Sequence, residues 1–475
     1  MHLQRRFSCH LALALIANLA IGTSRGETPV VDAPRPTPVT RPAMKRMLEG
    51  MKTRHERIPL PDPTEAEQAA AADDATALSY ENRLRSLYLP GTELRGYLGF
   101  GGTAPKRPGA PVPKVVIEPD PAVTLDYGFK TRLFWIAARV NNCQYCLGHQ
   151  ESKLLAVGMS DDDLARLDTD WSGFPENEQA AFALARKLTL APGSLTDTDV
   201  AACLEHFTPK EVIEMSLSVG GNNAINRWKE GIGVPQAGNG GNSGWAQTGA
   251  GGAHSYLTPT SAPYLALPSA VAVLGAELGG EALAATRAPA PLPTAEELAA
   301  GRAAARTRSA RLAPVDEATA REVLGDLAPA GAIPQWMRLL SHFPVAGPRM
   351  VRAFGLTASS PGLSPAERAR IAWTVARRNR AWYALGLAEN RLRDLGVDDA
   401  ALADLAGDQV RLSAAERAVL VVADTLAASP VACTDAQFED ALGATSPATL
   451  VHVVHEVAME SLFDRFTEAA GLPLE

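Results

Sequence analysis

The sequence predicts an all-α fold, and three observations support this prediction. The chain of 475 residues is 46% hydrophobic but only 6% aromatic, and its many alanine and leucine residues favour helices. Apolar residues recur at helical spacing, as in Leu133, Ile136, Ala137 and Val140. No segment shows the apolar–polar alternation that is typical of a half-buried β-strand.

The first residues have the pattern of an export signal. Arg5 and Arg6 precede an apolar stretch, residues 11–22, that is too short to span a bilayer comfortably. We therefore expect residues 1–26 to be a cleaved signal peptide and the protein to be exported, periplasmic or secreted; an uncleaved anchor is the alternative. No other segment is apolar and long enough for the membrane, so we expect no membrane span in the mature form. Residues 27–43 are rich in proline and are expected to be flexible.

Several helices have recognisable ends. We expect Asn142 to be the N-cap of a helix that runs to Gly158, because glycine suits the left-handed position after a helix. Three further starts follow the Ser/Thr-x-x-Glu pattern of a capping box: Thr208 with Glu211, Ser364 with Glu367, and Ser413 with Glu416. Pro209 and Pro365 stand at the first helical position, where a missing N–H group costs nothing.

The two halves of the chain resemble each other. Residues 138–167 and 376–405 align without a gap at a constant offset of 238 positions. The same offset pairs identical residues further away: Trp135 with Trp373, Glu178 with Glu416, Pro209 with Pro447, and Arg227 with Arg465. This shared register indicates a duplicated domain. A glycine-rich stretch, residues 238–262, is expected to link a first domain at 44–237 to a second at 263–475.

Charge and cysteine content narrow the function. The formal net charge is -8 and no long run of lysine and arginine is present, so we expect no nucleic-acid partner. Five cysteines are too few for a disulfide-stabilised scaffold of this length, and Cys9 lies within the expected signal peptide. The close pair Cys143 and Cys146 therefore needs its own explanation.

The segment NNCQYCLGHQ, residues 141–150, combines two thiols with an imidazole. On a helix, Cys143, Cys146 and His149 lie on consecutive turns near one face. The unpaired N–H groups of a first helical turn favour a thiolate and lower a thiol pKa. One cysteine can be oxidised to a sulfenic acid with which the other condenses, while the imidazole accepts or donates a proton. The second copy has other residues at these three positions: Ala381, Ala384 and Leu387.

The motif CQYCLGH resembles that of the AhpD-like proteins of the carboxymuconolactone decarboxylase family. The segments LFWIAARVNN, LLAVGMSDDDL and FTPKEVIEMSLSVGGNNAINRW extend the resemblance, which covers residues 125–235 well and 330–475 as a degenerate copy. It implies compact all-helical domains that assemble as oligomers. Two AhpD-like domains in tandem would then form a pseudo-dimer within one chain, and a homo-oligomer of the chain stays open.

For members with both cysteines, the resemblance implies reduction of a small-molecule hydroperoxide. Cys146 would attack the peroxide, Cys143 would resolve the product, and His149 would serve the proton relay. The redox-active cysteine pair would work without a further cofactor or a metal, and a thiol reductant of unknown identity would regenerate it.

Two positions depart from the family pattern. Thr131 stands where the family has a relay glutamate, and Gln150 stands where it has a histidine. Four other side chains are candidates for the relay or for lining the site: Tyr145, Glu151, Glu178 and Asn226. Glu178 is equally explained as a residue of a helix start.

Three other interpretations stay open. Cys203 and His206 form a CxxH pair that could join the two cysteines as zinc ligands. The helical pseudo-dimer could instead bind a partner or a small ligand without catalysis, or act as a lactone decarboxylase, which would not need the thiols.

His452 and His455 share a helical face but lack a third ligand, so we expect packed or surface histidines.

Overall fold

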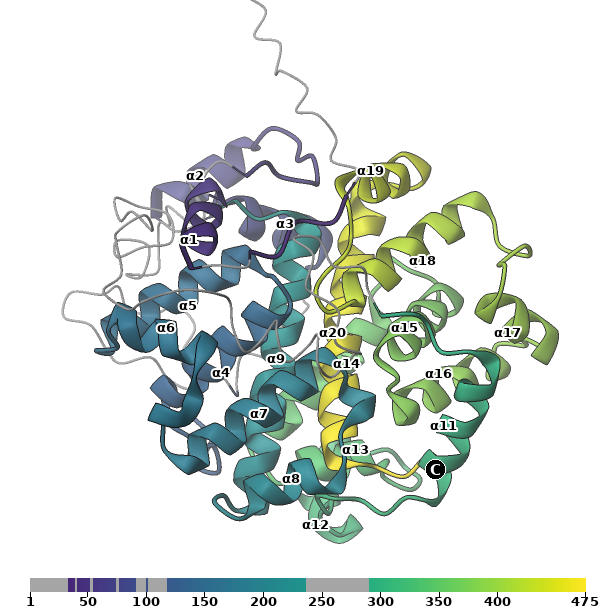
Figure 1. Cartoon of the computed structure of the whole chain (residues 1–475). Coiled ribbons are helices and arrows are strands. Elements are labelled where there is room, and N and C mark those ends of the chain that lie inside the picture. Colours follow the sequence, from purple (N-terminus) through teal and green to yellow (C-terminus); the bar gives the residue numbers. More distant parts are fainter. Residues whose placement is uncertain are drawn as a thin grey trace, which may run out of the picture.

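The computed structural model describes residues 33–38, 41–51, 54–73, 77–90, 100, 118–235 and 290–475 (Figure 1). These residues form 19 α-helices and no β-strand, which confirms the predicted all-α fold. No helix among them is long and apolar enough to cross a membrane. The expected signal peptide, residues 1–26, and the glycine-rich stretch, residues 238–262, lie outside the described residues.

The helices repeat in order along the chain. The described part of the first half contains α1 (Arg41–Gly50), α2 (Glu65–Asp73), α3 (Tyr80–Tyr88), α4 (Tyr127–Val140), α5 (Gln144–Ala156), α6 (Asp161–Thr169), α7 (Glu176–Leu190), α8 (Asp197–Leu204) and α9 (Pro209–Ile232). The described part of the second half contains α11 (Ala295–Thr307), α12 (Glu317–Leu324), α13 (Gln335–Leu340), α14 (Ala346–Ser359), α15 (Pro365–Asn379), α16 (Trp382–Asp394), α17 (Asp399–Ala406), α18 (Ala414–Ala427), α19 (Asp435–Ala444) and α20 (Pro447–Ala470). Each of α15 to α20 begins 238 positions after its counterpart among α4 to α9. The offset found in the sequence is therefore also the offset of the helices.

The predicted helix ends are present. Thr208, Ser364 and Ser413 are the N-caps of α9, α15 and α18, and each side chain accepts a hydrogen bond from the N–H of the glutamate three residues later. The proline residues predicted at the first helical position begin α9 and α15. Gly158, which follows α5, has a φ angle of 97°, in the left-handed region where glycine is favoured.

Helices α9 and α20 lie side by side at the centre of the molecule (Figure 1). Glycine allows their close approach. A Cβ atom at Gly220 would lie 2.7 Å from Leu462 Cδ1, and one at Gly231 would lie 2.5 Å from Val454 Cγ1. The buried side chains of both halves form one continuous hydrophobic core around this contact. The two repeats are thus joined by packing as well as by the chain, and the domain boundaries stay predictions.

Candidate functional site

The cysteine pair lies at a sharp junction between α4 and α5. Asn142 has a φ angle of 55°, so it adopts the left-handed conformation that ends α4. The N–H of Cys143 donates to Ala138 O over 2.9 Å, and the N–H of Asn142 donates to Arg139 O over 3.3 Å. These two bonds are those of a Schellman motif. The prediction that Asn142 caps α5 is wrong: Asn142 ends the preceding helix, and Cys143 is the N-cap residue, without a side-chain capping bond.

Both thiols are free and almost completely buried. Cys143 is 0% exposed and Cys146 is 2% exposed. Burial, followed by a hydrogen bond with Cys146 and the charges of Cys146 and Glu230, holds the pKa of Cys143 well above its usual value. Cys143 therefore stays protonated at neutral pH. The prediction that the helix start lowers the pKa of a thiol is wrong for this residue, because desolvation outweighs the N–H groups.

Glu230 is an ionised partner of Cys143, and sequence reasoning missed it. Its carboxylate is buried in the last turn of α9 and accepts a hydrogen bond from the Cys143 thiol. Burial alone would raise the pKa of Glu230, but the positive charges of Arg54, Arg35 and Arg57 lower it. Arg35 Nη1 lies 2.5 Å from Glu230 Oε2, and Arg54 Nη2 lies 3.3 Å from the same oxygen. The carboxylate is therefore ionised and orients the thiol proton.

The second half has the same acidic group without the thiols. Glu468, 238 positions after Glu230, accepts hydrogen bonds from Arg308 Nη1 at 2.7 Å and from the N–H of Tyr383 at 3.2 Å. Ala381 occupies the N-cap position of Cys143 and is likewise buried. The buried glutamate is thus part of the repeated frame, and the thiols distinguish the first half. This repetition was the available sequence signal for Glu230.

His149 lies on the next turn of α5 and is partly exposed. Its ring stacks on Tyr145 with centroids 4.3 Å apart, and its Nδ1 lies 3.2 Å from Tyr145 O. Since a carbonyl only accepts, Nδ1 carries the proton and Nε2 is the basic nitrogen. Burial, then the charges of Lys153 and Lys229, lowers the pKa of His149 to about 3. The imidazole is therefore neutral at neutral pH and a weak base, so it does not supply an imidazolium proton.

Two lysines add positive charge near Tyr145 and Cys146 of α5, and sequence reasoning missed both. Lys229 Nζ lies 4.6 Å from the centre of the Tyr145 ring and is paired with Glu81. Burial lowers the pKa of Lys153 to about 8, even though its interaction with Cys146 acts in the opposite direction. Lys153 follows Cys146 by seven residues on α5, which is two helical turns on the same face. This seven-residue spacing was the sequence signal that could have identified Lys153 as a neighbour of Cys146.

The remaining predicted site residues have different positions. Glu151 is buried on α5, two residues after His149. Asn226 accepts a hydrogen bond from Asn141 Nδ2 at 2.8 Å, so it lies beside the α4–α5 junction. Glu178 lies in the first turn of α7 and pairs with Arg132 at 2.6 Å. Glu178 therefore acts as a helix-start residue bound to an arginine. Thr131 donates its hydroxyl to Tyr127 O at 2.7 Å within α4.

The residues that the structure describes contain no candidate metal centre. No group of three or more His, Cys, Asp or Glu side chains there is arranged to hold a metal ion. Cys203 is buried, and its thiol donates to Ala180 O at 3.5 Å. His452 and His455 are packed histidines bonded to the hydroxyls of Ser360 and Thr357, each at 3.0 Å.

A short N-terminal segment, residues 33–38, lies over the site. Besides pairing with Glu230, Arg35 accepts a hydrogen bond at its carbonyl oxygen from Asn142 Nδ2 at 3.3 Å. Arg139 Nη2 donates to Pro38 O at 3.1 Å. We call residues 33–38 the cover segment, because these contacts connect it to the end of α4 and to Glu230 of α9.

Neither a family model nor a curated protein matches this chain. The resemblance to AhpD-like proteins therefore rests on the cysteine motif and the helical segments around it.

Proposed function

We propose that the first half of the chain is a thiol-dependent peroxidase or disulfide oxidoreductase, with Cys146 as the attacking residue and Cys143 as the resolving one. The observation that carries this proposal is the asymmetric environment of the two thiols. Cys143 is held protonated and hydrogen-bonded to Glu230, whereas Cys146 interacts with the cationic Lys153. A positive charge favours the thiolate, which is the nucleophile in thiol chemistry.

The proposed reaction balances with two thiols and one hydroperoxide. The Cys146 thiolate attacks the terminal peroxide oxygen, so that an S–O bond forms and the O–O bond breaks, and the alkoxide leaves as an alcohol after taking a proton from solvent. Cys143 then attacks the Cys146 sulfenic acid; an S–S bond forms and water leaves. An external dithiol, oxidised in turn, returns the pair to the reduced state. His149, neutral and partly exposed, can accept a hydrogen bond at Nε2 from the hydroperoxide and so orient it.

Burial of the thiols favours a second candidate, in which the helical frame binds a ligand or partner and the cysteines only pack in its core. In that case no peroxide reaches the sulfurs. For the peroxidase, the cover segment must move away from the α4–α5 junction during turnover. Export of the protein is a further part of our proposal and rests on the pattern of residues 1–26. A homo-oligomer of the chain is implied only by the resemblance to AhpD-like proteins and stays open.

The decisive experiment is mass spectrometry of the protein treated with a hydroperoxide. We expect a Cys143–Cys146 disulfide in the wild type, and in Cys143→Ser a sulfenic acid on Cys146 that dimedone traps. Cys146→Ser should give neither product. Cys203→Ser is the matched control, because burial raises the pKa of Cys203 to about 12 and its loss should leave the disulfide unchanged. Arg35→Ala, which releases the cover segment from Glu230, should accelerate disulfide formation.

The same experiment decides between the candidates. Thiols that stay reduced in peroxide-treated wild type and in Arg35→Ala would refute the peroxidase and leave the binding frame. A lactone decarboxylase would retain activity in the variant without either thiol.

A further inference from the structure

A cavity of about 380 Å³ lies in the second half of the chain, away from the cysteines, among α13, α14, α15, α16 and α20. Three aromatic rings form one wall. Trp336, Phe354 and Phe463 contact one another edge to face, with each pair of ring centroids 5.5 Å apart. A cavity of this volume with an aromatic wall has the size and character of a small-molecule site.

Two carboxyl groups from α20 also line the cavity. Glu456 is only 4% exposed, and Arg368 Nη1 bonds its Oε2 at 3.0 Å. No described residue donates a hydrogen bond to its other oxygen, Oε1. Glu460 lies one helical turn later, and its nearest cation, Arg391 Nη1, is 3.9 Å away. Asp394, at the end of α16, is a third carboxyl at this cavity.

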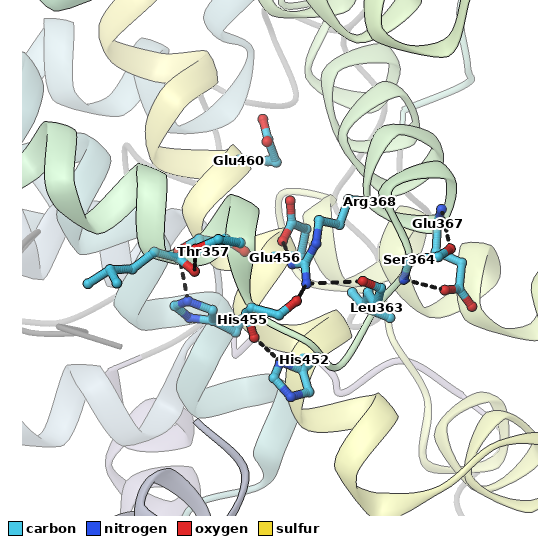
Figure 2. Close-up of polar contacts among 12 residues, drawn as sticks. Thr357, Leu363, Ser364, Glu367, Arg368, His452, His455, Glu456 and Glu460 are labelled. Carbon is cyan, nitrogen blue, oxygen red and sulfur yellow. Dashed lines mark hydrogen bonds and ion pairs between the residues drawn. The ribbon is translucent and has the colours of Figure 1, made fainter. Parts of the chain in front are cut away.

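Both terminal nitrogens of the nearest guanidinium, that of Arg368, already donate hydrogen bonds. Besides Glu456, Arg368 donates to the carbonyl oxygens of Thr357, Leu363 and Ser360. Figure 2 shows Arg368 beside Glu456 and Leu363. The side chain of Arg391 is 55% exposed and therefore lies largely in solvent. The terminal N–H groups of Arg368 are therefore occupied, whereas Glu456 Oε1 accepts no hydrogen bond from a described residue.

The ionisation of the carboxyls agrees with this geometry. Burial, then the charge of Glu460, raises the pKa of Glu456 to about 8, even though Arg368 and Arg391 act in the opposite direction. Burial also raises the pKa of Glu460. The nearby imidazoles add no charge, because burial lowers the pKa of His452 and lowers that of His455 to about 3. The charged or titratable groups around Glu456 are these: Arg368 on α15, Arg391 and Asp394 on α16, and His452, His455, Glu460 and Asp464 on α20.

We propose that this cavity binds a small organic cation, a primary amine or a quaternary ammonium, whose nitrogen lies against Glu456 and Glu460 and whose apolar part contacts Trp336, Phe354 and Phe463. Aromatic faces attract cations, and the desolvated carboxyls provide the opposite charge. A bound cation replaces the proton that Glu456 holds at neutral pH. Binding therefore releases a proton to solvent.

Calorimetry of the full chain with benzyltrimethylammonium chloride at pH 7 tests this proposal, because the probe has no exchangeable proton of its own. Titrations in two buffers of different ionisation enthalpy measure the protons released. We expect saturable binding of one cation with release of about one proton. Phenylacetate and benzyl alcohol, as anionic and neutral probes of similar shape, should bind about tenfold more weakly or worse.

Two conservative variants locate the site. Glu456→Gln and Glu460→Gln should each weaken benzyltrimethylammonium binding about tenfold or more, and Glu456→Gln should abolish the proton release. Glu322→Gln, on the exposed surface of α12, is the control and should bind as the wild type does. If Glu456→Gln does not fold, Glu460→Gln decides, because Glu460 makes only a long ion pair. Absence of saturable binding, equal binding of phenylacetate, or undiminished binding by the glutamine variants would overturn the proposal.

Discussion

At the residue scale, the two thiols differ because their neighbours differ. Cys143 has an anionic neighbour, Glu230, and Cys146 has a cationic one, Lys153. Both are buried, so these charges act through a medium of lower dielectric constant than water and have larger effects. The roles proposed for the two cysteines follow from this difference, which their shared CxxC motif does not contain.

Lys153 provides a direct test of the environment of Cys146. We expect Lys153→Met to slow alkylation of Cys146 by iodoacetamide at pH 7 about threefold to tenfold, because the variant loses the cation that interacts with Cys146. The pKa of Lys153 is about 8, so the cation is present below that pH and lost above it. The difference between wild type and variant should therefore disappear as the pH rises above about 9.

Peptide-resolved mass spectrometry measures these rates for each cysteine separately. Lys153→Arg keeps the charge and should restore the rate at pH 7. Lys187→Met is the control, since Lys187 pairs with Asp199 at 2.8 Å instead. Equal rates in wild type and Lys153→Met at pH 7 would show that Lys153 does not activate Cys146.

At the element scale, the closest contact between α9 and α20 requires glycine. We expect Gly231→Ala to destabilise the fold by about 1–3 kcal/mol, because the added Cβ would lie 2.5 Å from Val454 Cγ1, so that the packed Val454 side chain or the helices themselves must shift. Gly355→Ala is the matched control: Gly355 is also helical, but nothing lies within 4 Å of the added Cβ. The control should stabilise by about 0.5–1 kcal/mol through helix propensity.

Urea denaturation followed by circular dichroism measures both glycine variants. Loss of stability in Gly355→Ala as large as in Gly231→Ala would indicate that helix geometry, rather than the α9–α20 contact, determines the cost. An unchanged Gly231→Ala would mean that the two helices separate easily.

At the scale of the whole molecule, each half contributes one arginine that binds corresponding residues of the other half. Arg57 Nε donates to Asp435 Oδ1 of the second half at 2.7 Å, and Arg311 Nε donates to Asp197 Oδ1 of the first half at 2.7 Å. Asp435 and Asp197 are 238 positions apart and begin α19 and α8. The two contacts are therefore reciprocal, as expected for a pseudo-two-fold arrangement.

We expect Arg57→Ala and Arg311→Ala each to lower the free energy of unfolding by about 2–3 kcal/mol, because each removes hydrogen bonds to two carbonyl oxygens of buried residues and an ion pair to the other half. Arg57 donates to Glu230 O and Cys433 O, both at 3.1 Å. Arg311 donates to Glu468 O at 2.7 Å and Leu195 O at 2.9 Å. Since the halves share one core, each variant should shift a single cooperative unfolding transition.

Thermal unfolding followed by calorimetry and circular dichroism checks this expectation. Arg166→Ala is the control, because its 58% exposed side chain pairs only with Asp163 on its own helix, and it should change stability by less than about 0.5 kcal/mol. Two separate transitions in either arginine variant would show that the halves unfold independently.

The sequence by itself determined the local structure. The all-α fold, the capping boxes at Thr208, Ser364 and Ser413, and the register of 238 positions were all predictable. These features depend on hydrogen bonds and side-chain spacing between residues three or four positions apart, which a sequence displays directly. The position of Cys143 and Cys146 at a helix start follows for the same reason. Only the identity of the cap was wrong, because Asn142 fits the left-handed end of α4 as well as it fits an N-cap.

The tertiary structure alone decided the environment of the thiols. Glu230 and its partner Arg35 are 195 positions apart, and no local pattern connects them. Burial of both sulfurs, the charge of Lys153 beside Cys146, and the carboxyls of the α20 cavity likewise arise where α5, α9, α16 and α20 pack on other segments. Side-chain ionisation depends on the desolvation and charges that such packing brings together, and therefore on contacts between residues that are distant in the sequence.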